Sequence, residues 1–235
     1  MLMPNRWADM ALHRRHFEGI RRWVACHEAG HAVASWVMQR ELGLDGCHFE
    51  RIVVRTVSEA EAGAYITGMG CRIDCLGMVE EPARYQAVGR YVPDGMNGGV
   101  SRAEHDRIVG AWRRNMEADV IELLAGTLAE ARCRRISRSR VLLSGGSGDY
   151  AAALRKAHDF ARTEHDLSVM MAALWKRSAA VLRPPSRWAA VEALANALLE
   201  RHVLEADEAC AIIERAVRGV GAIRTPTRPP LGKPP

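Results

Sequence analysis

The chain has 235 residues, of which 48% are hydrophobic and 26% charged, with a net charge of +5 at neutral pH. This composition is typical of a soluble globular protein. No stretch approaches the ~18 consecutive apolar residues of a membrane span, and the basic N-terminus has no apolar secretory core behind it, so we expect a cytoplasmic protein. The six cysteines are irregularly spaced and form no Cys-x-x-Cys pair, which favours reduced thiols over a disulfide framework.

The first half of the chain predicts one helix followed by a small sheet. Apolar residues recur at helical spacing from Phe17 to Arg40, and two glycines shortly afterwards end this pattern. β-branched residues predict a strand over 49–57, and a second short strand is predicted over 63–67. Residues 68–100 contain seven glycines and two prolines, so we expect loops there.

The second half of the chain predicts helices. Ser101 and Glu104 resemble a capping box that opens a helix reaching about Cys133. A basic stretch at 132–140 and a glycine-rich turn at 144–148 come next. Further helices are predicted after that turn, with two prolines between the second and the third of them: 149–163, 167–182, 187–201 and 205–219.

These elements predict a fold that is mainly α with a small β-sheet. We divide the chain into a basic N-terminal segment over 1–18, one folded domain over 19–220, and a tail over 221–235. The tail is rich in proline and cannot bury much apolar surface, so we expect it to be disordered.

Chemistry is concentrated in the pentapeptide His-Glu-Ala-Gly-His at residues 27–31. On a helix, His27 and His31 project from the same face and can bind one metal ion, which is the signature of zinc peptidases. Glu28 would flank the ion and act as the general base. Gly30 costs about 1 kcal/mol relative to alanine within a helix, which suggests close packing against another element.

Two histidines do not complete a catalytic zinc site, so a third ligand must come from elsewhere in the chain. The carboxylates weighed for this role were Glu50, Asp106, Asp149 and Asp159. Asp149 is better placed than Glu50, because it follows the glycine-rich turn at the start of a predicted helix, whereas Glu50 adjoins a strand. Its residue type and position alone would favour a helix-capping role over metal binding.

Three segments in this order resemble the peptidase domain of the FtsH-type ATP-dependent zinc metalloproteases. They are residues 27–32 with the zinc signature, Leu124–Glu130, and Ser144–Tyr150, and the resemblance extends over about residues 20–215. It implies a zincin-like helical peptidase fold with Asp149 as the third zinc ligand. The middle segment departs from the family's Gly-Gly-Arg-Ala-Ala-Glu-Glu at several positions.

The sequence contains no Gly-x-x-x-x-Gly-Lys-Ser/Thr phosphate-binding loop, so we expect no ATPase activity of its own. The resulting prediction is a zinc metalloendopeptidase that hydrolyses peptides or unfolded proteins. The sequence leaves open whether a separate ATPase delivers these substrates and whether the protein forms oligomers. The alternative is a non-catalytic interaction or regulatory module that keeps the peptidase fold.

Two other groups of residues were weighed as sites. Cys47, His48, Cys71 and Cys75 could form a second zinc site, but their spacing fits no common pattern and favours structural or free thiols. The basic stretch at 132–140 has no interleaved aromatic residues, which argues against nucleic-acid binding.

Overall fold

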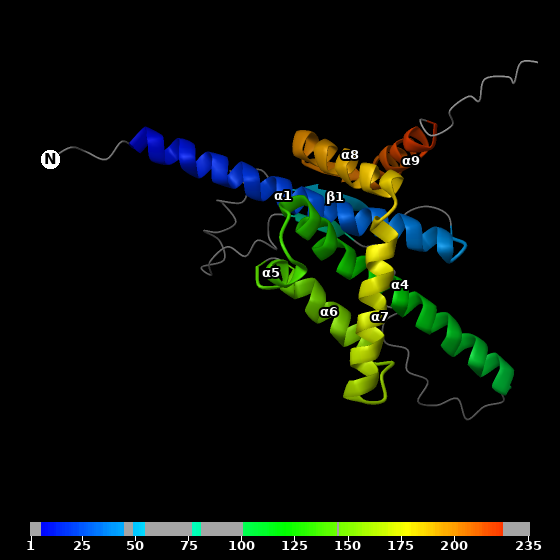
Figure 1. The fold of residues 1–235 in the computed structure, drawn as a ribbon. Helices are drawn as coiled ribbons and strands as arrows, with labels where there is room; N and C mark the ends of the chain where they lie inside the picture. Colours follow the sequence, from blue (N-terminus) through cyan, green and yellow to red (C-terminus); the bar gives the residue numbers. More distant parts are fainter. Residues whose placement is uncertain (1–5, 45–48, 55–76, 81–100, 145, 223–235) are drawn as a thin grey trace, which may run out of the picture.

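The computed structural model describes residues 6–44, 49–54, 77–80, 101–144 and 146–222 (Figure 1). Its elements in chain order are α1 (Arg6–Glu41), β1 (Arg51–Val54), β2 (Gly77–Glu80), α4 (Arg102–Arg134), α5 (Arg138–Leu142), α6 (Ser147–His158), α7 (Glu164–Leu182), α8 (Pro185–Arg201), β3 (Val203–Glu205) and α9 (Ala206–Ala222). The prediction of a mainly α fold with a small sheet is therefore confirmed for the described residues. No helix among these elements combines the length and the apolar character needed to cross a membrane.

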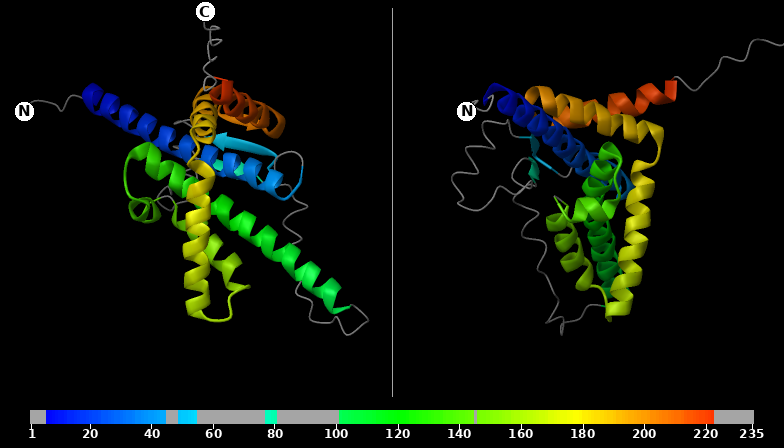
Figure 2. Two further views of the ribbon diagram at one scale, coloured as in Figure 1. Left: turned by 45° about the vertical axis from the view of Figure 1, so that its right-hand side comes forward. Right: turned by 60° about the vertical axis from the view of Figure 1, so that its left-hand side comes forward.

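Two long helices, α1 and α4, pack against each other and form the centre of the fold (Figure 1). α8 and α9 pack together on one side of α1, whereas α6 and α7 pack against α4. Figure 2 shows α7 crossing α4 and reaching from the α6 side of the molecule to α8. The two central helices thus carry the other elements on opposite sides.

The sheet lies beside α1 and has the order β2-β1-β3, with both pairings antiparallel. Ile52 in the middle strand is paired with Val79 on one side and with Leu204 on the other. Ile52 and Leu204 are fully buried, so this register points one face of the sheet into the core.

The ends of two helices follow from local hydrogen bonding. The Ser101 hydroxyl accepts a hydrogen bond from the backbone N–H of Glu104 at 3.2 Å, as the capping box predicts. Thr163 caps α7 in the same way, through the N–H of Asp166 at 3.1 Å. α4 ends where Arg135 adopts a left-handed conformation, with φ 55°.

Gly30 permits the close approach of α1 and α4. A Cβ at Gly30 would lie 2.5 Å from the Cβ of Ala129 and 2.8 Å from the carbonyl oxygen of Ala125. Both distances are far shorter than a carbon atom tolerates, so the close packing predicted for this glycine is confirmed. The helix-destabilising residue is therefore needed for the helix pair.

α1 begins at Arg6, whereas the sequence predicts a start near Phe17, so the helix runs across the predicted segment boundary at residue 18. The prediction relied on the spacing of apolar residues, which is irregular before Phe17. Residues 6–17 contain neither glycine nor proline and are rich in strong helix formers such as alanine, leucine, methionine and arginine. Helix propensity thus extends the helix beyond its apolar pattern.

The strands were predicted less well than the helices. β1 lies within the predicted strand 49–57, and β2 falls in the region predicted as loops. β3 falls at the junction between the helices predicted over 187–201 and 205–219. Both missed strands have only three or four residues and exist because they pair with β1, a tertiary contact that a local pattern cannot reveal. α9 reaches Ala222, so the first two residues of the tail predicted to be disordered over 221–235 are helical instead. The predicted strand 63–67 and the rest of the tail lie outside the described residues.

The basic stretch 132–140 joins α4 to α5, and three of its arginines stack on tryptophans of other helices. The distances from the arginine Cζ to the centroid of the indole ring are 3.9 Å for Arg132 over Trp188, 4.3 Å for Arg134 over Trp23 and 4.8 Å for Arg138 over Trp175. Such contacts stabilise the fold by cation–π attraction. Arg132 and Arg134 therefore connect α8 and α1 to the end of α4, and Arg138 connects α7 to α5.

The expectation of reduced thiols is correct at Cys26 and Cys133, which are free. It is wrong at Cys210 in α9, which is disulfide-bonded. The second zinc site weighed on Cys47, His48, Cys71 and Cys75 also lies outside the described residues.

Candidate metal centre

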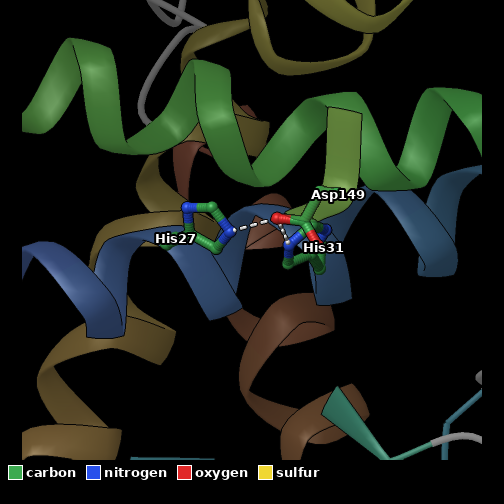
Figure 3. A group of neighbouring side chains, drawn as sticks. All are labelled: His27, His31 and Asp149. Carbon is green, nitrogen blue, oxygen red and sulfur yellow. Dashed lines mark hydrogen bonds and ion pairs between the residues drawn. The ribbon is translucent and has the colours of Figure 1, made fainter. Parts of the chain in front are cut away.

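His27 and His31 lie one turn apart on α1, and Asp149 reaches them from the first turn of α6 (Figure 3). Asp149 Oδ2 is 2.8 Å from His27 Nε2 and 3.4 Å from His31 Nε2. One ligand atom from each residue lies within 4.8 Å of the others, so the three side chains can hold one metal ion. The structure thus brings together the two imidazoles and the distant carboxylate that the sequence singled out.

The other carboxylates weighed as third ligand lie elsewhere. Glu50 is exposed beside β1, and Asp106 is exposed near the start of α4, where it contacts His105. Asp159 is exposed at the C-terminal end of α6. Among the described residues, only His27, His31 and Asp149 form a group that can hold a metal ion.

Asp149 does not cap its helix. The capping position of α6 is Gly146, which makes Asp149 the third residue of the helix proper. A Cβ at Gly146 would lie 2.5 Å from Thr127 Oγ1, so this glycine lets the turn before α6 pack directly against α4. That packing places Asp149 over the two histidines, near the helix N-terminus, where the helix dipole favours a negative charge.

Both imidazoles are held by hydrogen bonds from their second ring nitrogen. Nδ1 of His27 donates to Glu130 Oε2 at 3.0 Å, and Nδ1 of His31 donates to the backbone carbonyl of Glu122 at 2.8 Å. A carboxylate and a carbonyl can only accept, so each Nδ1 carries a proton. In the neutral ring the lone pair is then on Nε2, the atom that faces Asp149, as in histidines that bind metals.

Glu130 is the residue of this site that sequence reasoning missed. It lies in α4, is 4% exposed, and shares its carboxylate between His27 and Arg134, whose Nη1 is 2.5 Å from Oε1. Arg134 is held in turn by stacking on Trp23, one turn before His27 on α1. The signal available in the sequence was that Glu130 is part of the segment Leu124–Glu130, which resembles a family motif. The sequence alone indicates no role for Glu130 within that segment.

Gly126 is a second missed residue. A Cβ there would fall on the imidazole of His31, 2.5 Å from Cε1 and 2.7 Å from Cδ2. The His31 ring therefore occupies the space that a side chain at position 126 of α4 would fill. Gly30 and Gly126 together allow the two helices to approach closely enough to enclose the rings.

Glu28 lies next to the ligand residues and is 7% exposed. Burial raises the pKa of its carboxyl group, although the neighbouring imidazoles of His27 and His31 act in the opposite direction. A carboxylate with a raised pKa is a stronger base than one in water, which suits proton transfer near neutral pH.

When no metal is bound, the imidazoles of His27 and His31 both form ion pairs with the Asp149 carboxylate. Burial lowers the pKa of His27, but hydrogen bonds with Asp149 and Glu130 outweigh that effect and raise the pKa to about 10. Burial also acts to lower the pKa of His31, but the charge of Asp149, its hydrogen bond and the charge of Glu28 together outweigh that effect and raise the pKa. Burial acts to raise the pKa of Asp149, but the two imidazoles hold it well below its usual range.

These pKa shifts predict how the metal-free protein responds to pH. The contribution of His27 to stability is fully present below pH 6.5 and is lost as the pH rises towards about 10. The contribution of Asp149 is present above pH 3.8 and is lost as the pH falls below it. Because a metal must displace a proton from the imidazoles, we expect stabilisation by zinc to grow over the same alkaline range.

Urea unfolding of chelator-treated and zinc-saturated protein between pH 6 and 10 tests this prediction. The free energy of unfolding of the metal-free protein should fall across the range, and the gap to the zinc-saturated protein should widen. A constant gap would show that the proton and the metal do not compete for these rings.

Replacing Glu130 by glutamine is expected to weaken metal binding by about 10- to 100-fold, because the substitution removes the charge that orients His27 through Nδ1. The matched control is Glu117→Gln, since Glu117 also lies in α4 and also pairs with two basic side chains, in its case two arginines. Competition with a zinc-sensitive dye measures both affinities. Equal affinities in the two variants would remove Glu130 from the support of the site.

A scan against protein-family models finds no match for this sequence, and a search of curated proteins finds none either.

Proposed function

We propose that this protein is a zinc-dependent metallopeptidase in which His27, His31 and Asp149 bind the metal and Glu28 is the general base. The single observation that carries the proposal is the orientation of the two imidazoles. Each is fixed through Nδ1 by an acceptor on α4, and this directs both Nε2 atoms at the Asp149 carboxylate.

The donor set suits zinc. Two imidazole nitrogens and one carboxylate oxygen are the protein ligands of a catalytic zinc site that keeps a fourth position open. The His27 side chain is 10% exposed and that of Asp149 is 28% exposed, so the group is reachable from the Asp149 side. The same ligand types also serve Fe(II) oxygenases, but a carboxylate base next to the ligands favours hydrolysis.

Zinc bound by these residues would polarise a substrate carbonyl and lower the pKa of a coordinated water to about 7. The Glu28 carboxylate would accept a proton from the attacking water and deliver it to the nitrogen of the leaving amine. Glu130 would keep the His27 ring in place during this transfer, while Arg134 holds Glu130.

We further propose that the protein is related to the FtsH-type peptidases and has their zincin-like fold. The order of the three sequence segments supports this, and so does the arrangement of one residue from each of them: His27 binds Glu130 and faces Asp149. The proposed substrates are peptides or unfolded proteins in the cytoplasm. Delivery by a separate ATPase and assembly into an oligomer are parts of the same proposal.

The experiment is metal analysis of purified protein combined with cleavage of a permanently unfolded protein. We expect about one zinc per chain, cleavage that stops when a chelator removes the metal, and recovery when zinc is returned. Bound iron without zinc would overturn the assignment of the metal. Zinc-replete protein that cleaves neither the unfolded protein nor a broad peptide library would overturn the peptidase proposal and favour the non-catalytic interaction module.

A further inference from the structure

We propose that Cys26 and Cys133 are a redox modification site, at which a reversible disulfide locks α1 to α4 beside the metal centre. The two thiols come from helices that are far apart in the sequence and form the main helix pair of the fold. Neither cysteine takes part in the proposed peptidase chemistry, so this inference is independent of it.

The distance between the two sulfur atoms is the first argument. Cys26 Sγ lies 2.7 Å from Cys133 Sγ, in a contact where the Cys26 thiol donates. A disulfide bond is about 2.05 Å long, so the atoms need to approach by only about 0.7 Å more. Only a small movement is therefore needed to bring the sulfur atoms to bonding distance.

The surroundings of Cys133 are the second argument. Cys133 is only partly buried, whereas Cys26 is 4% exposed, so an oxidant reaches Cys133 first. The hydrogen bond from Cys26 and the nearby Arg22 guanidinium outweigh burial and lower the pKa of Cys133 to about 7. A partly exposed thiolate beside a cation and next to a second thiol is typical of oxidation-sensitive cysteines.

Hydrogen peroxide is a suitable oxidant for this pair of thiols. The Cys133 thiolate would attack one peroxide oxygen, the O–O bond would break, and a sulfenic acid would form. The departing hydroxide would take up the proton that the Cys133 thiol had released on ionisation, giving one water. Cys26 sulfur would then attack Cys133 sulfur, and the expelled hydroxide would take up the Cys26 proton as a second water. Two thiols and one peroxide thus give one disulfide and two waters.

The disulfide would constrain the residues that hold the candidate metal ligands in place. Cys26 precedes His27 on α1, and Cys133 follows Glu130 by three residues on α4. The His27–Glu130 hydrogen bond therefore spans the same helix contact as the disulfide. Oxidation would fix the separation of the ring and its hydrogen-bond acceptor.

The test is peroxide treatment of the full chain, followed by alkylation of free thiols and non-reducing peptide mass spectrometry. We expect a cross-linked peptide pair joining Cys26 to Cys133, which dithiothreitol reverses. A sulfinic acid on Cys133, or a Cys26 that is still fully alkylated after Cys133 has been oxidised, would overturn the proposal.

Thermal unfolding supplies a second readout. A cross-link closing a loop of about 100 residues should raise the melting temperature of the wild-type protein by roughly 10 °C on oxidation. Cys133→Ser is the matched control, because it retains the disulfide of Cys210 and should show no such rise. An equal rise in this variant would assign the stabilisation to other cysteines and contradict the lock.

Discussion

Glu28→Gln is expected to lower the rate of peptide hydrolysis by about 10²- to 10⁴-fold while the protein keeps its metal. Glutamine has nearly the same shape as glutamate but cannot take a proton from water at neutral pH. Glu28 adjoins His27 in the sequence and is buried, and glutamine fills the same space, so the substitution removes a base without opening a cavity. Single-turnover cleavage of an unfolded substrate, measured with zinc content, tests this expectation.

The matched control for this variant is Glu41→Gln, because Glu41 is an exposed residue at the end of the same helix. It should leave the rate and the metal content unchanged. Wild-type activity in Glu28→Gln would remove Glu28 from the mechanism, even if the metal site is real. Loss of zinc from this variant would instead show that Glu28 supports the site structurally.

Gly126→Ala is expected to abolish metal binding, although alanine is ordinarily the better helix residue. The added methyl group would fall on the His31 ring, which must then swing away and lose its Nδ1 hydrogen bond to the Glu122 carbonyl. Overpacking of this kind costs about 1–3 kcal/mol in stability. Zinc titration and urea unfolding of the variant measure the two effects separately.

Gly110→Ala provides the control within α4. A Cβ at Gly110 would meet only the end of the flexible Arg114 side chain, at 3.6 Å. We expect unchanged metal binding and a gain of up to about 1 kcal/mol in stability, because the helix loses a glycine. If Gly126→Ala binds zinc as tightly as Gly110→Ala does, the His31 ring does not hold the ligand position described above.

The sequence was most informative where a local pattern repeats over several turns. The helices α4, α7, α8 and α9 were predicted within a few residues of their observed ends, because their apolar spacing and capping residues are local signals. The short α5 and the strands β2 and β3 were missed. Each is too short to have a period, and the strands depend on pairing with β1.

The candidate site could be predicted in part for a related reason. His27, Glu28 and His31 form a contiguous motif, so their spacing alone indicates a metal. Asp149 was singled out only with the help of the family resemblance. Glu130 and Gly126 could not be assigned a role, because their importance arises from how closely α4 approaches α1.

His27 and Asp149 are 122 positions apart in the sequence, so the candidate metal centre is a product of tertiary structure. An unfolded chain offers only the paired imidazoles, so an ion that prefers all three ligands binds the folded state and shifts the folding equilibrium by mass action. At free zinc concentrations one hundred times the dissociation constant, that shift is about 2.7 kcal/mol. The supply of zinc would then help to determine how many molecules keep α6 attached to the central helix pair.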